Sequence, residues 1–494
     1  YLTEDIKIVL LPKNQEDSDI TLQSTISASL SEEYNITLVD YTTGKNIKSF
    51  VVSTASQQTK VSDGTYLIFI ENKKGIEEIL LDNNGIGYKA GDTVVIPLYC
   101  RPTLVTCQLE DQFYLDFPWR VEPSKNIPVF GVVDTPTNLW NVRIYDTKHT
   151  GDTSDDTLLD QMEFSPSLSI TSSDLPYTFE FSVNPSSITT INGRASIRIV
   201  FRVDAIIDYD NDEGPLEVLI GTSNLPKLIK WYAGDTHFHS EYTYNAVEFG
   251  SPIETISASS KAIGLDWVTI TDHSFDLDPS RWSNLGVDCN SISDGDFKCI
   301  RGEEISCYLP GTFNSICLGC CQYDHYLAYG INSYIPGGEC EDDTGSDHTP
   351  TEVVSLVNNQ DGFGYVAHPM YDDPFRDPWR DQDYSLDFTG LEIWNGIENV
   401  AELESGLNKW KELLLTGRKV YLEGGSDAHG DLNDGFGKVR TYVYTESFGE
   451  DGILNALRNG HSIMTDGPLV IFNITNEHSE TAIIGDEITG NELS

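Results

Sequence analysis

The segment Gly234-Asp-Thr-His-Phe-His-Ser240 places two histidines, His237 and His239, two residues apart. Successive side chains of an extended strand point to opposite faces, so residues two apart share a face. Two imidazoles that project from one side of a strand end can bind the same cation. We therefore predict that this segment ends a β-strand and begins a metal site.

Four later segments also end on residues that bind metals well. Asp272 and His273 follow the apolar run WVTIT, and His368 follows GFGYVA, while Glu304 lies in RGEEIS and Asp427 and His429 lie in GGSDAH. Five of the ten histidines of the chain fall in these few segments. Chance scatter would not concentrate them there, so we expect each segment to close a strand beside the first one.

From Trp231 onward, helix and strand signals alternate. Ser251-Pro-Ile-Glu254 and Thr349-Pro-Thr-Glu352 both match a helix start, with a capping hydroxyl, Pro at the first helical position and Glu at the third. Apolar runs such as DWVTITDH, FTGLEIWN and KVYLEGGSDAH predict strands between helices, which we expect near 399–416 and 451–459. This alternation indicates a parallel sheet or barrel of βα units, whose active sites lie at the C-terminal ends of the strands.

The first 228 residues have a different pattern. Short runs rich in Val, Ile, Thr and Tyr, such as YNITLVDY and ASIRIVFRV, alternate with Gly, Asn, Asp and Pro clusters. This pattern is typical of antiparallel β structure, and we predict two sandwich-like modules at about 1–110 and 115–228. They contain one histidine, His149, in a loop-like stretch. A binding, spacing or anchoring role is therefore expected for them, with possible contact to a cell surface or polymer. Residues 476–494 begin a further β-like extension.

The chain is strongly acidic. It has 494 residues, with 78 Asp and Glu against 31 Lys and Arg, and a formal net charge of -47. Such a surface repels nucleic acid phosphates and anionic lipid headgroups, so we expect neither as a partner. No stretch approaches the roughly 18 consecutive apolar residues that span a bilayer.

Cysteine placement favours an exported protein. Cys100 and Cys107 form a close pair, and the other seven cysteines fall between Cys289 and Cys340. Such clusters usually form disulfides in an oxidising compartment, so we expect a secreted or cell-surface location. The alternative is a structural zinc site around the three neighbouring cysteines at 317, 320 and 321.

Residues 231 to about 475 resemble the PHP (polymerase and histidinol phosphatase) superfamily, most closely its carbaryl-hydrolase-like metallohydrolase branch. The segments that carry the resemblance are GDTHFHS, VTITDHS, GEEIS, VAHP, GLEIWNG, GGSDAH and LRNGHSIMTDGP. The resemblance implies a distorted (β/α)7 barrel with up to three divalent cations. Imidazole and carboxylate ligands suit Zn, Mn or Fe, and we expect two or three such ions.

The resemblance also implies a ligand set for each ion. The first ion would be bound by His237, His239, Glu304 and Asp427, the second by Glu304 and His368, and the third by His273 and His429. Glu304 is favoured over Glu303 because the family places its Glu directly before Ile-Ser. Asp272 would support the site rather than bind a metal directly.

Two departures from the family pattern leave the number of ions open. Many members have an Asp or His shortly after the first motif, where this chain has Asn245, and Glu248 could substitute for it. Members also have a His soon after the Glu motif, where this chain offers Thr312 or Asn314. We expect His325 and His348 to be ordinary loop residues, and the alternative is that they fold back to complete the site.

The residues that would contact substrate are fewer. Lys438 and Arg440 follow the last motif and are the best candidates to hold a phosphate, although surface cations paired with carboxylates are an equally good interpretation. His461 is a candidate late general acid.

These predictions favour a secreted hydrolase that cleaves small-molecule phosphate mono- or diesters with water activated by metal ions. The first alternative is hydrolysis of carbamates or aryl esters on the same metals. The second is a surface binding protein with a degenerate metal-binding barrel.

Overall fold

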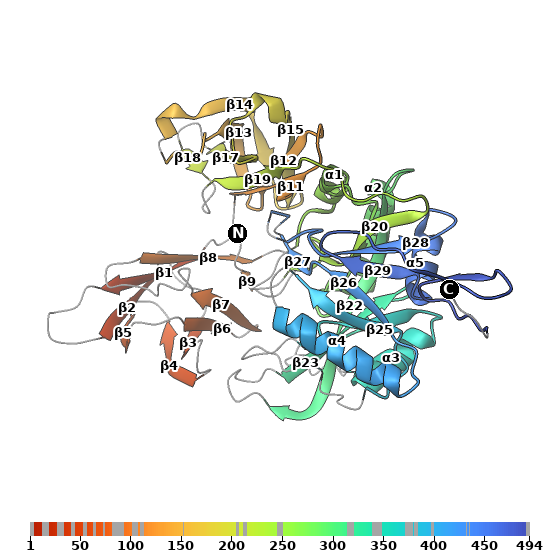
Figure 1. Cartoon of the computed structure of the whole chain (residues 1–494). Coiled ribbons are helices and arrows are strands. Elements are labelled where there is room, and N and C mark those ends of the chain that lie inside the picture. Colours follow the sequence, from red (N-terminus) through yellow and green to blue (C-terminus); the bar gives the residue numbers. More distant parts are fainter. Residues whose placement is uncertain are drawn as a thin grey trace.

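Residues 231–465 form a mixed, barrel-like sheet in the computed structural model (Figure 1). In chain order the strands are β20 (Trp231–His239), β21 (Trp267–Ile270), β22 (Lys298–Phe313), β23 (Cys321–Tyr329), β24 (Phe363–Val366), β25 (Gly390–Asn395), β26 (Tyr421–Gly425), β27 (Ala428–His429), β28 (Arg440–Tyr444) and β29 (Ser462–Thr465). Their order across the sheet is β26-β25-β24-β23-β22-β21-β20-β28-β29, and β27 pairs with β20.

The sheet curls until β26, at one edge of this order, lies beside β28 near the other edge. Gly424 of β26 and Thr441 of β28 exchange two hydrogen bonds, from the Gly424 N–H to the Thr441 hydroxyl at 3.1 Å and from that hydroxyl to the Gly424 carbonyl at 2.9 Å. The Asp427 N–H donates to the His237 carbonyl of β20 at 2.8 Å. Because these bonds bring the end of β26 beside the end of β20, residues on both strands reach one interior.

The structure describes residues 113–151, 153–203, 215–244, 250–307, 324–337, 348–370, 379, 384–396, 402–430, 432–433 and 435–490, together with the backbone of strands and helices that lie outside these ranges.

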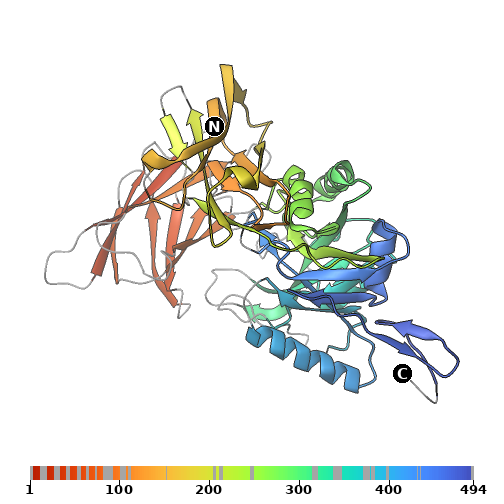
Figure 2. The same ribbon diagram turned by 45° about the horizontal axis from the view of Figure 1, so that its top comes forward.

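Five α-helices accompany the sheet in the part of the chain that the structure describes: α1 (Ile253–Ile263), α2 (Pro279–Ile292), α3 (Pro350–Asn358), α4 (Val400–Leu415) and α5 (Glu450–Arg458). Figures 1 and 2 show α1 and α2 on the side of the sheet that faces the β-rich part of the chain, and α3 and α4 on the other side. None of the described helices has the length and apolar character needed to cross a membrane.

The two predicted helix starts have different outcomes. The capping box at Thr349 and Glu352 is confirmed, since each side chain bonds the backbone of the other. The start at Ser251 is wrong, because α1 begins at Ile253 without a side-chain cap. The Ser251 N–H instead donates to the His239 carbonyl at 3.3 Å, which holds Ser251 in an extended conformation beside β20.

The predicted alternation of strands and helices is present in part, since β23 and β28 run antiparallel to their neighbours and no described helix separates β24 from β25. Strands β20, β21, β22, β24, β25 and β26 run parallel, but β23 lies antiparallel between β22 and β24. We expected Glu304 at the end of its strand, whereas β22 continues past it to Phe313 and turns into β23. A hairpin therefore takes the place of one βα unit, and the sheet is mixed rather than a regular series of seven units.

A β-sandwich (residues 113–220) precedes the barrel, as predicted for this part of the chain. One sheet contains β10 (Phe113–Asp116), β12 (Ile127–Val133) and β15 (Tyr177–Val183). The other contains β11 (Arg120–Val121), β13 (Thr137–Asp146), β14 (Thr157–Ile170), β16 (Thr190–Ile191), β17 (Arg194–Val203), β18 (Ile207–Asp210) and β19 (Leu216–Ile220). Short 3₁₀ turns lie at Thr153–Asp155 and Pro185–Ser187.

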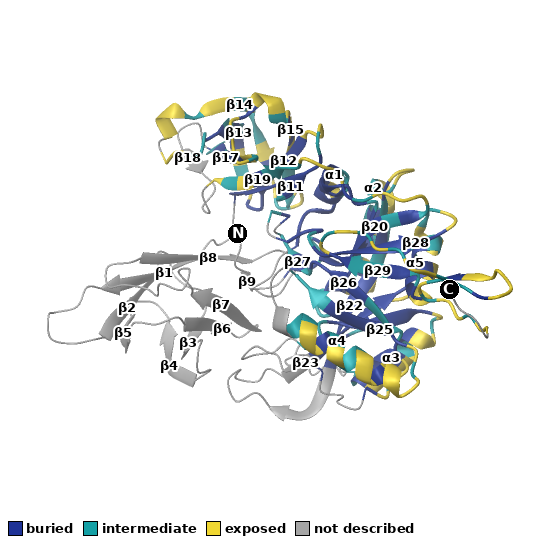
Figure 3. Cartoon of the chain, viewed as in Figure 1, coloured by how far each residue is buried: buried dark blue, intermediate teal, exposed yellow. Residues whose placement is uncertain are grey.

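The core of the β-sandwich lies between its two sheets. Val129 and Phe181 of one sheet pack with Ile144, Ile197 and Phe201 of the other, and all five side chains are at most 2% exposed. On β15 the exposed Glu180 and Ser182 flank Phe181, whereas β12 is buried on both faces. Figure 3 shows the exposed residues of this module along β14. Period-two alternation in the sequence therefore predicted this module well.

The N-terminal module is described by its strand backbones alone. These are β1 (Glu4–Leu11), β2 (Asp19–Ile26), β3 (Tyr34–Asp40), β4 (Lys45–Val52), β5 (Gln57–Ser62), β6 (Tyr66–Asn72), β7 (Gly75–Leu81), β8 (Thr93–Cys100) and β9 (Cys107–Gln108). They pair in two antiparallel sheets, β5-β2-β1-β8-β9 and β4-β3-β6-β7. At the other end of the chain, β30 (Asn473–Thr475) and β31 (Thr481–Ile483) form a hairpin, so β structure continues into the predicted C-terminal extension.

Candidate metal centre

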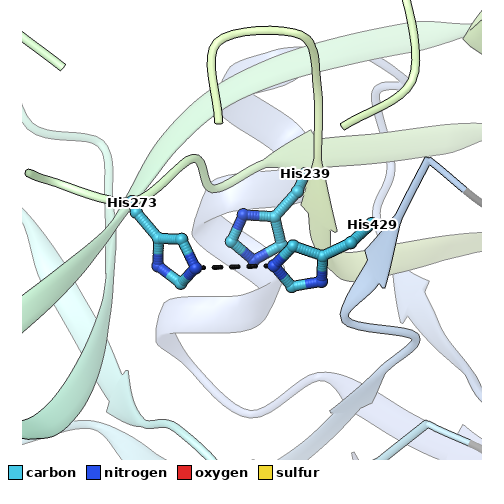
Figure 4. A group of neighbouring side chains, drawn as sticks. All are labelled: His239, His273 and His429. Atoms are coloured by element: carbon cyan, nitrogen blue, oxygen red, sulfur yellow. Dashed lines mark hydrogen bonds between the residues drawn. The ribbon is translucent and has the colours of Figure 1, made fainter. Parts of the chain in front are cut away.

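The histidines and carboxylates of the sequence motifs meet where the parallel strands end. His237 and His239 lie at the C-terminal end of β20. His273 follows β21, His368 follows β24, and Asp427 follows β26. Glu304 projects from β22 into the same space, and His429 on β27 pairs with His239. Figure 4 shows three of these imidazoles, from three separate strand ends, pointing toward one another.

Four residues place their ligand atoms around one point. His237 Nε2 lies 3.0 Å from Asp427 Oδ1, 3.2 Å from His239 Nε2 and 3.5 Å from Glu304 Oε1. His239 Nε2 lies 3.1 Å from Asp427 Oδ1 and 3.3 Å from Glu304 Oε2. Ligands bound about 2.0–2.1 Å from a tetrahedral zinc ion lie about 3.3–3.4 Å apart. The observed spacings are close to this value, so these residues fit a cation of that size.

Glu304 occupies the centre of the cluster. Its Oε1 lies 2.7 Å from His325 Nδ1 and 3.1 Å from His368 Nε2, and its Oε2 lies 2.8 Å from His273 Nδ1. With His237 and His239, five imidazoles surround one carboxylate. The Oε2 oxygen accepts no hydrogen bond from the described residues despite its complete burial. A carboxylate with nitrogen ligands crowded around both oxygens is suited to bridge two cations.

A third group consists of His239, His273 and His429. His273 Nε2 and His429 Nε2 are 3.4 Å apart, and the rings of His239 and His429 stack with centroids 3.8 Å apart (Figure 4). The half-buried Phe275 ring stacks on the His273 ring, with centroids 4.8 Å apart. This group adjoins the first one through their shared residue, His239.

Hydrogen bonds to Nδ1 aim three of the imidazoles at the centre. His237 Nδ1 lies 3.1 Å from both oxygens of Glu392, His239 Nδ1 lies 2.8 Å from the Thr243 hydroxyl, and His429 Nδ1 lies 2.8 Å from the Asp427 carbonyl. A carboxylate and a carbonyl only accept, and the Thr243 hydroxyl already donates to Asp272. Each Nδ1 therefore carries the proton, which leaves Nε2 free to bind a metal, as is usual for metal-ligating histidines.

Asp272 supports this arrangement without facing the cluster itself. Its carboxylate accepts hydrogen bonds from the Ser240 N–H and hydroxyl, both at 2.7 Å, and from the Thr243 N–H and hydroxyl, both at 3.0 Å. Burial raises the pKa of Asp272, although His239 and these donors oppose the shift. Because Thr243 bonds the His239 ring, Asp272 orients that ligand indirectly, as expected for a supporting carboxylate.

Burial and backbone strain distinguish the cluster from an ordinary surface group. His237, His239 and Glu304 are 0% exposed, whereas the Asp427 and His429 side chains are 16% and 19% exposed and mark the open side. His368 and Asp427 adopt positive φ angles of 27° and 52°. Non-glycine residues rarely adopt such angles, and strain of this kind concentrates at functional sites.

Electrostatics keep the carboxylates charged. Burial would raise the pKa of Glu304, but His325, His237 and His273 hold it well below its usual range. Burial likewise opposes the ionisation of Asp427, and neighbouring imidazoles, His237 foremost, hold its pKa well below normal. Burial would lower the pKa of His237, but its three carboxylate neighbours raise it well above its usual value. A cation that binds here therefore displaces a proton.

The structure adds two residues to the cluster, His325, for which the site role was only the alternative, and Glu392, which the sequence did not single out. His325, expected to be a loop residue, is on β23 with its ring against Glu304, where it fills the position left open after the Glu motif. The expectation was wrong because β23 pairs with β22 and places His325 opposite Ser306, on the same face as Glu304. Glu392 was also missed, although a Glu inside the apolar strand GLEIWN is a signal of a buried polar contact.

Three predicted catalytic residues lie away from the cluster. The guanidinium of Arg440 donates to the carbonyls of Gly437, Lys438 and Gly467, because Arg440 points to the face of β28 opposite Thr441. The Lys438 ammonium lies 5.2 Å from the Trp119 ring of the β-sandwich. The His461 ring bonds Asp486 at 2.9 Å.

The position of His461 follows from strand register. Its carbonyl accepts from the N–H of Tyr444, which pairs with Trp231 at the start of β20. His237 lies six residues further along that strand, a separation of roughly 20 Å. The candidate general acid is therefore at the wrong end of the barrel.

Some predictions concern residues outside the described ranges. They include Glu248 and Asn245, the alternative ligands Thr312 and Asn314, and the cysteines proposed for a zinc site.

Within the described part, Cys289 of α2 and Cys299 of β22 form a disulfide, and Cys307 is a buried free thiol. His149 bonds Glu217 and the Arg194 carbonyl of the β-sandwich, away from the cluster.

Comparison of the chain with protein-family models and with curated proteins finds no match. The geometry alone therefore defines the site. Its buried His, Glu and Asp groups can hold a metal ion, in three overlapping sets that share His239, His273 and Glu304.

Proposed function

We propose that this chain is a metal-dependent hydrolase of the PHP superfamily that cleaves phosphate mono- or diesters. The observation that carries the proposal is the Glu304 carboxylate, buried among five imidazoles that four other strands supply. Five imidazole nitrogens lie 2.7–3.5 Å from the two oxygens of this carboxylate. Such a concentration of nitrogen and oxygen ligands suits a divalent cation. The mixed barrel-like sheet fits a distorted (β/α)7 barrel in which β23 replaces one βα unit.

The residues present fit two or three cations. His237, His239, Glu304 and Asp427 would hold the first ion, and His239, His273 and His429 offer a further position. Glu304 and His325 would hold another ion, with His273 in the same group and His368 3.1 Å from Glu304 Oε1. When bound, divalent Zn, Mn or Fe would supply Lewis acidity, which lowers the pKa of water and stabilises charge on a phosphoryl group.

The protein's own groups prepare the site for that chemistry. Glu392 and Thr243 hold the imidazoles of His237 and His239 in one tautomer, and the Asn395 amide donates to Asp427 Oδ2 at 2.9 Å. These bonds fix the ligands before substrate binds, so little rearrangement is needed during the reaction. The partly exposed edges of Asp427 and His429 leave one side open to substrate.

Charge favours an anionic substrate despite the acidic surface. Glu304 and Asp427 contribute two negative charges, so two or three divalent ions leave the site with a net charge of about +2 to +4. A phosphate ester matches this charge, and the site does not require Lys438 or Arg440 to hold it.

A second candidate, hydrolysis of a carbamate or aryl ester, is favoured by Phe275. Its half-buried ring stacks on His273 and offers an apolar face beside the cluster. An uncharged aromatic substrate would use that face, whereas a phosphate would not.

Metal analysis and a substrate panel test the proposal. We expect the purified chain to bind at least one Zn or Mn per molecule and to hydrolyse p-nitrophenyl phosphate or bis-p-nitrophenyl phosphate. Turnover of naphthyl carbamate alone would favour the second candidate. A chain that binds no transition metal would instead favour the surface binding protein. His237→Ala should abolish activity, and an unchanged far-UV circular dichroism spectrum would show that the β modules stay folded.

We also propose that the chain acts outside the cytosol. The Cys289–Cys299 disulfide supports this location, since such bonds persist mainly in oxidising compartments. Mass spectrometry of the alkylated natural protein should find these two cysteines blocked until a reductant is added, and two free thiols there would contradict an exported protein.

A further inference from the structure

We propose that the β-sandwich positions the ligands of the metal centre. It does so by binding the two loops that follow the ligand-bearing strands. The first ligand loop (residues 240–244) follows His239, and the second ligand loop (residues 430–437) follows His429. This inference rests on the metal binding of the proposed function, but not on hydrolysis or on the class of substrate.

The first ligand loop connects a metal ligand to the β-sandwich through two neighbouring residues. Thr243 bonds the His239 ring at 2.8 Å and accepts the His273 N–H at 3.2 Å. The next residue, Tyr244, is 4% exposed, and its hydroxyl donates to Oδ2 of Asp134 at 3.1 Å. Asp134 directly follows β12 and is 7% exposed. A buried, charge-assisted hydrogen bond therefore fixes the loop whose hydroxyl orients His239.

The described residues of the second ligand loop bond the β-sandwich at several points. The Leu432 carbonyl accepts the Trp119 N–H at 3.2 Å, and the Phe436 carbonyl accepts the Trp119 indole N–H at 2.8 Å. The Asn433 amide donates to the carbonyls of Phe117 and Glu217 at 3.3 and 2.9 Å. Trp119 thus holds both ends of the segment from Leu432 to Phe436.

The bonds continue from this loop to the metal ligands. The Gly437 N–H, one residue after Phe436, donates to Asp235 Oδ2 at 3.3 Å. Asp235 Oδ1 accepts the N–H groups of His237 at 3.3 Å and Ser426 at 2.9 Å. Ser426 directly precedes the ligand Asp427. A displacement of the second ligand loop would therefore move Asp235 and, through it, the proposed ligands His237 and Asp427.

The hydrophobic cores of the two parts are also shared. Phe130 of β12 is 1% exposed and belongs to the barrel core that contains Phe238 and Ala428, which flank His237 and His429. Ala262 of α1 belongs in turn to the core of the β-sandwich. Each part therefore buries a side chain in the core of the other. This packing resists motion of the β-sandwich relative to the barrel, because separation would expose apolar surface on both. An accessory module that only tethers or anchors would not need this contact.

Three Phe substitutions in the full-length chain test the inference. Tyr244→Phe removes the hydroxyl that bonds Asp134, and Trp119→Phe removes the indole N–H that bonds Phe436. Tyr442→Phe is the matched control, because its hydroxyl donates to the Pro226 carbonyl at 3.0 Å and Pro226 lies in the linker before the barrel, not in a ligand loop. Zinc dissociation constants are measured by chelator competition, with far-UV circular dichroism and the Tm of the metal-free form measured alongside.

We expect Tyr244→Phe and Trp119→Phe to raise the zinc Kd about threefold to tenfold, less than the 10–100-fold typical when a direct partner of a ligand is lost. Tyr442→Phe should lower the Tm to a similar extent with the zinc Kd unchanged. Asp134→Asn combined with Tyr244→Phe should weaken zinc binding no further than Tyr244→Phe alone, since both remove one bond.

The outcomes separate this inference from the proposed function. Unchanged zinc affinity in both Tyr244→Phe and Trp119→Phe, with lowered Tm values, would make the contact a purely structural one and overturn the inference. A wild-type chain that binds no zinc would overturn the proposed function first. Normal zinc binding without hydrolysis of any substrate would leave the inference standing and contradict only the hydrolase.

Discussion

The two ends of the barrel are built from opposite kinds of residue, although the same strands run through both. Where the parallel strands begin, Trp267, Ile300 and Phe363 pack against Ile453 and Leu457 of α5, and all five are at most 3% exposed. Where the strands finish, the equally buried interior consists of imidazoles and carboxylates. Figure 3 shows most described residues of the barrel strands as buried, with intermediate ones in β25, β26 and β29.

The difference separates the residues that stabilise the barrel from those that could hold a metal ion. A buried apolar side chain stabilises a fold by about 1.5–3 kcal/mol, whereas a buried charge without a partner costs several kcal/mol. The apolar end therefore supports a polar end that would not be stable alone. Within that polar end, the attraction between imidazoles and carboxylates offsets the free-energy cost of burying each group. A bound cation would take over this role from the protons on the imidazoles.

Glu304→Gln should have the largest effect on this contrast. The substitution keeps the shape of the side chain but removes the charge that five imidazoles surround. We expect zinc affinity and kcat/KM to fall more than about 100-fold, beyond what loss of an outer hydrogen-bond partner produces. Isothermal titration with zinc and steady-state kinetics measure the two quantities.

Glu303→Gln is the matched control for this substitution. Glu303 adjoins Glu304 but points to the other face of β22, where its carboxylate accepts the Ile335 N–H at 3.2 Å. Burial raises the pKa of Glu303 well above its usual range, so an uncharged amide is a close substitute. Equal losses of zinc affinity in both variants would mean that general disruption, not the bridging carboxylate, explains the first result.

The affinity for zinc should rise with pH. In the metal-free protein the carboxylates around His237 outweigh burial and raise its pKa well above its usual value, so the proton and zinc compete for this imidazole. Below that raised pKa, each unit of acidification should weaken binding by about tenfold for one displaced proton. Chelator competition at several pH values gives the slope, and a flat profile would show that no ligand holds a proton.

Glu392→Gln should have a smaller effect, because Glu392 contacts a ligand and not the cation. Loss of its charge weakens the bond to His237 Nδ1, and we expect zinc affinity to fall about tenfold. Glu423→Gln provides the comparison, since Glu423 pairs with Glu392 across the sheet but bonds the Tyr329 hydroxyl at 2.9 Å. Zinc titration of both variants measures the difference, and a larger loss in Glu423→Gln would contradict the role given to Glu392.

The polar end was largely predictable from sequence because its signals are local. A ligand-type residue directly after an apolar run marks a strand end, and parallel strands bring such ends together. His325 escaped this reasoning because its position depends on the pairing of β23 with β22, across a long insertion. Period-two alternation in the segment from Tyr323 to Tyr329 is the signal that could have predicted a strand with His325 on the inner face.

The predicted substrate-contacting residues show the limit of local reasoning. Lys438 and Arg440 follow the last motif closely, but proximity in sequence does not determine which face of β28 a side chain occupies. Arg440 points away from the cluster, and the hydrogen bonds of Thr441 to β26 decide that orientation. In the same way, Ser251 matched a helix cap in sequence, but its backbone pairs with β20 instead.

His461→Gln should have the smallest effect and tests the contrast between the two ends most directly. His461 is at the apolar end, and its ring forms a partly exposed pair with Asp486, a contact that contributes less than about 1 kcal/mol to stability. We expect kcat/KM and zinc affinity to stay at wild-type values, because the residue is roughly 20 Å from His237 along the strands. A tenfold or greater fall in kcat with unchanged zinc affinity would place its imidazole in the chemistry. A residue at the apolar end would then take part in catalysis. This result would contradict the claim that the apolar end contributes only to stability.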